Sequence, residues 1–319
     1  MSATAPVMPV DLTRLDALAA ERGIALLSGA PMAPFTTLRV GGAADRLLPV
    51  HSRAELVGAL RLARDAGCPW FVLGNGSDLV VADGGIRGLV IRNRARVVAV
   101  DGLRLDADAG APMALLVRTS IAAGLAGLEF GTSIPGTLGG AVWANAGAHE
   151  SEMRGVIATV DTWDPRDDSG STLGADACAF AYRDSRFKHA PEVVLSATLV
   201  LQSDEPPSIA ARVAANQAQR VATQPLADQN AGSVFRNPPG DHAGRLIDVA
   251  GLKGSRVGGA SISERHANFI VTDRGARAAD VRALGDRVHD EVLARSGIEL
   301  QYEIEFVGDW PAEAAEGAS

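Results

Sequence analysis

"LGNGSDLVVADGG" (residues 73–85) decides the fold class, because this glycine-rich stretch begins like a dinucleotide-binding fingerprint and then departs from it. It follows "WFVL", an apolar run that predicts a buried strand. Leucine stands at position 79 in place of the third glycine, and the residues after it favour a strand where the fingerprint needs a helix. A Rossmann fold is therefore not predicted. The chain also contains no Gly-Lys pair, which excludes a P-loop.

The rest of the chain mixes helices and strands without strict alternation, which favours an α+β fold over a doubly wound sheet. Ser52 and Glu55 match a capping box that opens a helix ending at Gly67. Asp101 and Gly102 predict the turn of a hairpin over residues 96–110, and residues 131–148 read as a long loop. The predicted helices cover about 11–22, 53–66, 112–123, 208–222, 243–250 and 277–296. The predicted strands lie within 35–50, 70–73, 88–93, 156–164, 192–202, 268–272 and 298–308.

The length of 319 residues predicts two or three domains. Pro206 and Pro207 mark a plausible boundary between them. We expect residues 1–205 to form one domain with subdomains of about 1–95 and 96–205. Residues 206–319 would form a second, smaller domain.

Composition excludes several classes of function. A net charge of −8, with no run rich in lysine or arginine, argues against a nucleic-acid partner. No signal peptide and no apolar stretch of membrane-spanning length is present, so we expect no membrane insertion. Cys68 and Cys178 fit buried thiols of a cytoplasmic protein, and the six histidines show no metal-ligand spacing. We expect a cytoplasmic monomer without a structural metal.

Two glycine loops are candidates for anion binding. Glycines at positions 74 and 76 allow the amides of Asn75, Gly76 and Ser77 to point into one concave nest. Gly136, Thr137, Gly139 and Gly140 offer the same chemistry in a second loop. Two such loops would hold a diphosphate from two sides. From the residues alone, a pair of ordinary turns explains the glycines equally well.

Eight segments, taken in order, resemble the family of UDP-N-acetylenolpyruvoylglucosamine reductases and cover about residues 35–308. They are "TLRVGGAAD", "LGNGSDLVVADGGIRGLVI", "GLEFGTSIPGTLGGAVWANAGA", "YRDSRFK", "NAGSVFRNP", "AGRLIDVAGLKGSRVGGASIS", "HANFIV" and "YEIEFVG". Only a few residues separate "YRDSRFK" from the next strand, so the chain is similar to the shorter branch, which lacks an inserted loop with a substrate-covering tyrosine.

The resemblance implies an FAD-binding domain of the vanillyl-alcohol-oxidase (PCMH) type with two subdomains, followed by a substrate domain. It implies that NADPH reduces FAD and that the flavin reduces the enolpyruvyl group of a UDP-sugar to give UDP-N-acetylmuramate. The flavin, the nicotinamide donor and the sugar all come from the resemblance. The implied FAD-binding residues are Gly74, Asn75, Gly76, Ser77, Asp78, Ile134, Pro135, Gly136, Thr137, Gly139 and Gly140.

Ser233, in "NAGSVFRNP", matches the serine that donates a proton in this family. Hydride addition to an enol ether conjugated with a carboxylate leaves charge at the carbon next to that carboxylate, and this carbon must then be protonated. No adjacent His and Asp accompany the serine, which weakens a nucleophilic role. A turn hydroxyl that caps a backbone amide is the alternative from the residues alone.

Arg183 and Glu303 match the family's paired arginine and glutamate. A guanidinium would stabilise the carboxylate or enolate, although a surface ion pair with Asp184 is the commoner fate of an arginine. Arg186 ranks second for the same role. Strand alternation places Glu303 and Glu305 on one face, so periodicity does not choose between them, and only the resemblance favours Glu303.

Four further residues are expected at the substrate: Tyr182, Arg236, Asn237 and His266. Arg220 is a candidate for the uridine diphosphate, but a charge on a helix surface is the more ordinary interpretation. Two other functions remain possible from the sequence. One is a different FAD oxidoreductase with the same glycine loops, such as an oxidase of a sugar or alcohol. The other is a nucleotide-binding regulator without activity.

Overall fold

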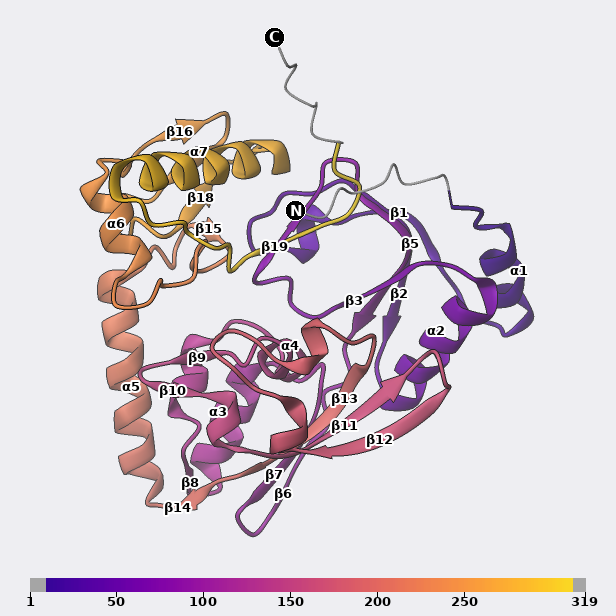
Figure 1. Ribbon diagram of the computed structural model, residues 1–319. Helices are drawn as coiled ribbons and strands as arrows, with labels where there is room; N and C mark the ends of the chain where they lie inside the picture. Colours follow the sequence, from indigo (N-terminus) through magenta and orange to yellow (C-terminus); the bar gives the residue numbers. More distant parts are fainter. Residues whose placement is uncertain (1–9, 312–319) are drawn as a thin grey trace.

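The computed structural model describes residues 10–311, and the chain is organised as three lobes (Figure 1). The first lobe is a four-stranded sheet with a helix in its crossover connection. Its strands, in spatial order, are β1 (Leu27–Pro31), β2 (Ala43–Val50), β5 (Ile86–Asn93) and β3 (Trp70–Leu73), and its helices are α1 (Thr13–Glu21) and α2 (Arg53–Ala66). Strands β2, β5 and β3 run parallel. Apolar clusters lie against the sheet, with leucines of α2 in the larger one.

The predicted start and end of α2 are confirmed. Ser52 Oγ accepts a hydrogen bond from the backbone N–H of Glu55, and Gly67 ends the helix with φ of 64°. The Glu55 carboxylate accepts from the backbone N–H of His51, one residue before the capping serine. Local capping chemistry therefore sets this helix as the sequence predicts.

The second lobe contains a five-stranded antiparallel sheet and two helices. Its strands, in order, are β12 (Ser169–Gly174), β11 (Ile157–Asp164), β13 (Val193–Val200), β7 (Arg104–Asp108) and β6 (Val98–Asp101). Small two-stranded pairings add β14 (Gln202–Ser203) with β8 (Leu125–Ala126) and β10 (Ser151–Glu152) with β9 (Gly147–Ala148). The helices are α3 (Met113–Ala122) and α4 (Leu138–Trp143). The predicted hairpin turn at Gly102 is confirmed, because it connects β6 to β7.

The long loop predicted over residues 131–148 is wrong in part, because it contains α4. Glycine at two of the first three positions of this helix masks its helical character in the sequence. Leu138, Ala141 and Val142 are buried in the core of the second lobe, and this packing outweighs the low propensity. The helix therefore depends on tertiary contacts.

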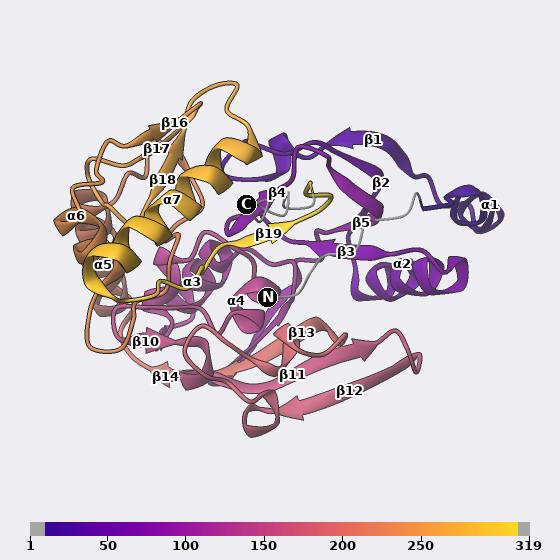
Figure 2. The same cartoon turned by 45° about the horizontal axis from the view of Figure 1, so that its top comes forward.

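The third lobe contains a small antiparallel sheet covered by two helices. Its strands are β15 (Gln229–Asn230), β18 (Ile270–Thr272), β17 (Ala260–Ile262) and β16 (Arg256–Val257), and its helices are α6 (Ala243–Val249) and α7 (Ala278–Ser296). Helix α5 (Pro206–Thr223) precedes this lobe but packs along the second one, against α3 and the 3-10 turn at Glu129–Ser133 (Figures 1 and 2). The mixture of sheets and helices confirms the predicted α+β class.

The C-terminal segment returns to the first lobe. Strand β19 (Glu305–Val307) pairs in parallel with β4 (Leu79–Val81), the strand that follows the first glycine loop. The predicted strand over 298–308 is therefore too long, and only its last part is in a ladder. Before β19, Tyr302 stacks on Phe235 and donates a hydrogen bond to Asp286 of α7. These contacts carry the segment across the third lobe before it reaches β4.

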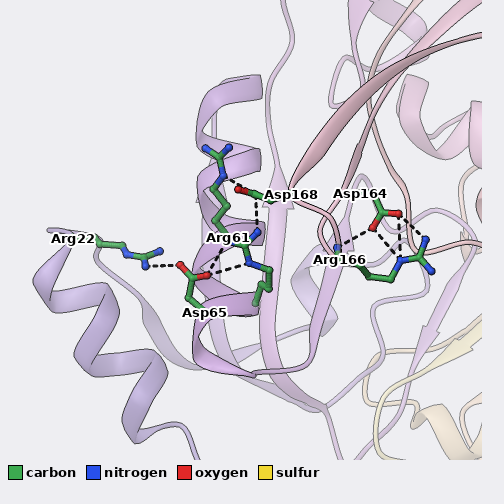
Figure 3. Close-up of polar contacts among 7 residues, drawn as sticks. Arg22, Arg61, Asp65, Asp164, Arg166 and Asp168 are labelled. Atoms are coloured by element: carbon green, nitrogen blue, oxygen red, sulfur yellow. Dashed lines mark hydrogen bonds and ion pairs between the residues drawn. The ribbon is translucent and has the colours of Figure 1, made fainter.

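Ion pairs connect the first and second lobes on the side of α2. Asp168, in the turn between β11 and β12, pairs with Arg61 and Arg64 of α2, each at 2.8 Å (Figure 3). Arg53 Nε also lies 2.5 Å from Oδ1 of Asp108, whose side chain is nearly inaccessible to water. The exposed pairs contribute about 0.2–1 kcal/mol each, so they orient α2 over the second sheet more than they stabilise the fold.

Candidate active site

A large cleft lies where the three lobes meet. Its volume is about 1180 Å³, above the range of about 300–1,000 Å³ that holds a single drug-sized ligand. All three lobes contribute to its lining, through residues 74–78 of the first, 133–140 with Arg183 of the second, and Ser233 with Glu303 of the third. The cleft therefore has room for a long cofactor and a substrate together.

The two glycine loops contact each other at one end of this cleft. Asn75 Nδ2 donates a 2.9 Å hydrogen bond to the carbonyl oxygen of Pro135. A Cβ atom placed on Gly74 would lie 2.6 Å from Thr137 Oγ1, so the loops approach more closely than a side chain allows. Gly76 has φ of 60°, a conformation that favours glycine. Close approach and backbone conformation together explain the glycines here.

The loop amides fit a diphosphate. Within residues 10–311, no acceptor is recorded for the backbone N–H of Asn75, Gly76 or Ser77. These three donors lie beside the second loop and line the cleft together with Thr137. Backbone amides arranged in this way form a concave site for phosphate oxygens. The donor set thus suits the diphosphate of a dinucleotide such as FAD.

Arg183 is presented by a tight turn. The backbones of Ala181 and Asp184 exchange hydrogen bonds of 3.0 and 3.1 Å, which leaves Tyr182 and Arg183 at the tip. Arg183 has φ of 55°, a strained value for a residue that is not glycine. Its side chain turns into the cleft, where Nη2 donates to the carbonyl oxygen of Gly147 at 2.9 Å. Strain of this kind is common at residues that serve a site.

Glu303 and Glu305 both line the cleft, but they have different partners. Glu303 Oε1 lies 2.6 Å from Arg183 Nε, and Glu305 Oε1 lies 2.9 Å from Lys188 Nζ. The predicted alternation is correct here, since Tyr302 and Ile304 belong to the third-lobe core. Burial raises the pKa of Glu303, while the charge of Arg183 opposes this shift. The structure therefore pairs Glu303, not Glu305, with the arginine.

Ser233 reaches the cleft because its segment pairs with the C-terminal one. The backbone N–H groups of Arg236 and Glu303 donate to the carbonyl oxygens of Gln301 and Val234, each at 2.8 Å. On the other side, the backbone N–H of Val234 donates to Asn268 at 2.9 Å. Ser233 lines the cleft, and its hydroxyl caps no backbone amide between residues 10 and 311.

Comparisons with known proteins identify the family. A model described as "UDP-N-acetylenolpyruvoylglucosamine reductase, C-terminal domain" matches residues 224–307, and one described as "FAD binding domain" matches 44–166. The reductase of Moorella thermoacetica is 45% identical over 300 residues, which are 92% of this chain and 99% of that protein. The reductase of Heliobacterium modesticaldum is 45% identical over 283 residues, 88% and 90% of the two chains. The chain belongs to the UDP-N-acetylenolpyruvoylglucosamine reductase family.

A solved structure supports the same conclusion at the level of fold. The crystal structure of the reductase from Thermus caldophilus superposes with a TM-score of 0.76 at 37% identity, covering 90% of this chain and 98% of that one. Together with the matched family models, this likeness confirms the predicted α+β FAD-binding fold. The members of this reductase family with which the chain aligns span nearly all of it.

The cleft contains some of the predicted site residues and not others. Its lining includes every predicted FAD-binding residue, the three candidate catalytic residues and Asn237. Tyr182, Arg236 and His266 are absent from that lining. The Tyr182 ring is 51% exposed and lies 5.4 Å from the Arg183 guanidinium, while His266 packs on Phe269. Substrate contact by these three residues stays a prediction.

Two cleft residues were missed or ranked low from the sequence. Lys188 was not singled out, although its ammonium lies over the Trp143 ring at 4.1 Å and its side chain is only 10% exposed. No local pattern in the sequence connects Lys188 with its partner Glu305. Arg220 was read as a surface charge, yet it lines the cleft. Burial lowers its pKa, and its recorded partner is Gln224.

Arg186, the second choice for the active-site arginine, faces elsewhere. Its Nη2 pairs with Glu192 at 2.9 Å and its Nη1 donates to the carbonyl oxygen of Ala177. It does not belong to the cleft lining, whereas Arg183 does. Arg183 lies at the tip of the 181–184 turn, whereas Arg186 begins the separate 3-10 turn at Arg186–Lys188.

The carboxyl group of Asp78 has a raised pKa. Withdrawal from water, followed by the negative charge of Glu305, raises its pKa from 3.8 to about 6. The folded state therefore holds a proton that the unfolded state loses as the pH rises above about 4. The stabilising contribution of this proton is complete below the unfolded pKa and is lost as the pH rises through the folded one.

Asp78→Asn is therefore expected to become more stable relative to wild type as the pH rises from 4.5 to 7.5, by on the order of 1–2 kcal/mol. The asparagine keeps a neutral side chain at every pH and avoids the cost of ionisation beside Glu305. Thermal unfolding of the two apoproteins at several pH values measures the effect, with exposed Asp101→Asn as the control. A difference in melting temperature that is independent of pH would contradict the assignment.

Gly74→Ala is expected to weaken FAD binding, because the added methyl would push against Thr137 and separate the two loops. The matched control is Gly155→Ala, where the same methyl would meet nothing within 4 Å and the backbone is ordinary. Titration of each apoprotein with FAD, followed by flavin fluorescence, measures the dissociation constant. Equal affinities in the two variants would count against contact between the loops and the cofactor.

Proposed function

We propose that this chain reduces the enolpyruvyl group of UDP-N-acetylglucosamine enolpyruvate to give UDP-N-acetylmuramate, the reduction step of peptidoglycan precursor synthesis. It is an FAD-dependent oxidoreductase, and NADPH is the reductant. The observation that carries the proposal is the meeting of Arg183, Ser233 and Glu303 in the cleft that the glycine loops line. Arg183 and Glu303 lie more than 100 positions apart along the chain, so only the folding of the chain brings them together.

The residues have separate tasks. When bound, FAD would supply the redox chemistry that connects NADPH oxidation to hydride addition at the enolpyruvyl methylene carbon. Asn75, Gly76, Ser77 and the loop at 134–140 would hold its diphosphate through backbone amides. The protein must then orient the UDP-sugar and stabilise the negative charge that develops on its enolpyruvyl group.

Arg183 would stabilise that charge. Its guanidinium lies in the cleft and can donate to the substrate carboxylate, whose oxygens take up electron density as the methylene becomes a methyl group. Glu303 holds one side of this guanidinium and the Gly147 carbonyl holds another. Because these two contacts restrict the side-chain rotamer, the remaining N–H groups would be available to donate to the substrate.

Ser233 would complete the reaction. Its hydroxyl donates a proton to the carbon next to the carboxylate, and the electron pair of that carbon forms the new C–H bond. The resulting alkoxide recovers a proton from solvent. A serine is a weak acid, so the strongly basic carbanionic carbon drives the transfer. The hydroxyl would be available for this task because Ser233 lines the cleft and, within residues 10–311, its side chain caps no backbone group.

The test is anaerobic and separates two half-reactions. The purified protein should be yellow, lose its visible flavin absorbance with NADPH, and recover it when the enolpyruvyl UDP-sugar is added. A flavin that oxygen reoxidises rapidly while the sugar has no effect would favour an oxidase instead. A correctly folded protein that takes up no FAD would overturn the proposal.

We also propose a division of tasks along the chain. Residues 1–205 would bind FAD, with subdomains of about 1–95 and 96–205, and residues 206–319 would bind the UDP-sugar. The family models at 44–166 and 224–307 support this division. Helix α5 packs on the second lobe, so it would form the wall between the two regions.

We further propose a cytoplasmic monomer without a nucleic-acid partner. The net charge of −8 supports the last point. Within residues 10–311, no helix has both the length and the apolar character needed to span a bilayer. Size-exclusion chromatography with light scattering would determine the oligomeric state.

A further inference from the structure

Asn145 is a buried polar residue at the C-terminal end of α4, between the second glycine loop and Arg183. Its side chain is 0% exposed, and all of its polar atoms have partners. Nδ2 donates to the carbonyl oxygen of Ala181 at 2.8 Å and to Glu152 Oε2 at 3.0 Å. Oδ1 accepts from the backbone N–H of Arg154 at 3.0 Å. One amide group therefore joins the end of α4 to two other segments, the one containing Glu152 and Arg154 and the turn at Ala181.

The Ala181 carbonyl is the oxygen that closes the turn carrying Arg183. It accepts a hydrogen bond from the Asp184 backbone and a second one from Asn145, so both of its lone pairs are used. Arg183, at the tip of this turn, has a positive φ that its surroundings must maintain. Ser185 adds a second connection, because its Oγ donates to the Trp143 carbonyl oxygen at 2.7 Å.

The same short segment contacts the other side of the arginine. Gly147, two residues after Asn145, provides the carbonyl oxygen that receives Arg183 Nη2. Asn145 itself has φ of 43°, which turns the chain sharply after α4 and leads it to Gly147. Asparagine tolerates this conformation better than most residues. Both the backbone of Arg183 and its guanidinium are thus located relative to the end of α4.

We propose that Asn145 is a positioning residue that sets the place of Arg183 relative to the second glycine loop. Helix α4 begins directly after Thr137 of that loop and ends beside Asn145. The hydrogen bond from Asn145 to the Ala181 carbonyl oxygen then fixes the turn relative to the end of the helix. This inference rests on the proposed function, in which the glycine loops hold the cofactor and Arg183 contacts the substrate. Asn145 itself is fully buried and does not belong to the cleft lining.

Two variants test the side-chain amide of Asn145 separately from its backbone conformation. Asn145→Gly keeps the positive φ without strain and removes every side-chain hydrogen bond. Asn145→Asp keeps the shape but replaces the donor by a carboxylate that faces the Ala181 carbonyl and Glu152. In both, we expect flavin reduction by NADPH near the wild-type rate and reoxidation by the enolpyruvyl sugar slower by about 10²-fold, as for a misplaced catalytic group. Thr162→Val, which removes a buried hydrogen bond outside the cleft, is the control.

A double-mutant cycle with Arg183→Ala distinguishes positioning from general stability. If Asn145 acts through Arg183, Asn145→Gly adds little further loss of reoxidation rate in the Arg183→Ala protein. Hydrogen exchange of the Ala181 and Asp184 amides gives a readout that needs no cofactor, and both should exchange faster in Asn145→Gly than in Thr162→Val.

The outcomes are distinct. The positioning role would be overturned if the losses in reoxidation rate multiplied in the double mutant, or if the hydrogen exchange rates of the Ala181 and Asp184 amides did not change. Neither result would affect the reductase activity of the wild type. Wild-type holoenzyme that fails to reduce the sugar would instead overturn the proposed function, and with it the inference. Slow reoxidation in Asn145→Gly, fast amide exchange and no added loss beside Arg183→Ala would together support it.

Discussion

Ser233→Ala should reduce its flavin with NADPH almost as wild type does, and should then fail to return the electrons to the sugar at a useful rate. The variant loses only the proton donor, and general acid catalysis contributes about 10²–10⁴-fold to such steps. We expect a loss of that size in reoxidation. The serine hydroxyl forms no recorded hydrogen bond in the described structure, so its removal leaves no buried group without a partner and should hardly change stability.

Stopped-flow absorbance of the flavin measures both half-reactions of this variant. Ser261→Ala, in β17 and outside the cleft lining, is a suitable control in the same lobe. Equal losses in the two half-reactions would contradict an acid role, because they would point to a disturbed cofactor site. Melting temperatures of the variant and the control should agree within the error of the measurement.

Glu303→Gln should slow reoxidation far more than Glu305→Gln does, although the two acids lie on one face of the same segment. The first change removes the carboxylate that holds the Arg183 guanidinium from 2.6 Å, and loss of orientation at a catalytic group costs about 10²-fold. The second change removes the partner of Lys188 and leaves Arg183 in place. Glutamine keeps the length and shape of both side chains.

The comparison is made in the same stopped-flow assay, with the dissociation constant for FAD measured beside it. A larger effect at Glu305 than at Glu303 would show that the pairing of Glu303 with Arg183 does not serve the reaction. Similar, small effects at both positions would assign the two acids a role in folding only, and thermal unfolding would then show the loss.

Much of the local structure is predictable because local chemistry produces it. Ser52 and Gly67 bound α2 through hydrogen bonds within a few residues, and Gly102 forms its hairpin turn through its own backbone freedom. Helix α3 likewise ends just before Gly124, whose positive φ is a local property of glycine. Helix α4 was missed because Gly139 and Gly140 hide it, and only its burial in the second lobe makes it form. The predicted terminal strand is too long because, before Glu305, the segment forms only an isolated bridge with the Ser233 segment, and the continuous ladder with β4 begins at Glu305.

In the candidate site, too, local patterns in the sequence do not show which distant residues come into contact. The glycine loops are visible in the sequence because glycine is favoured where φ is positive, as at Gly76, or where a Cβ atom has no room, as at Gly74. Lys188 was overlooked because its partner, Glu305, lies 117 residues away along the chain. No periodicity connects two such positions. Arg220 was assigned to the surface because a helical pattern shows which face is polar, and does not show whether that polar face meets water or a cleft.

By itself, the sequence of this protein determined most of its helices and turns, its glycine loops and the residue types available for catalysis, since these depend on neighbours within a few positions. The tertiary structure alone decided which acid meets Arg183. Glu303 and Glu305 are equivalent by alternation. They become different only when the C-terminal segment pairs with the Ser233 segment on one side and with β4 on the other. Those pairings join parts of the chain more than 60 residues apart, and their register depends on packing that no local pattern records.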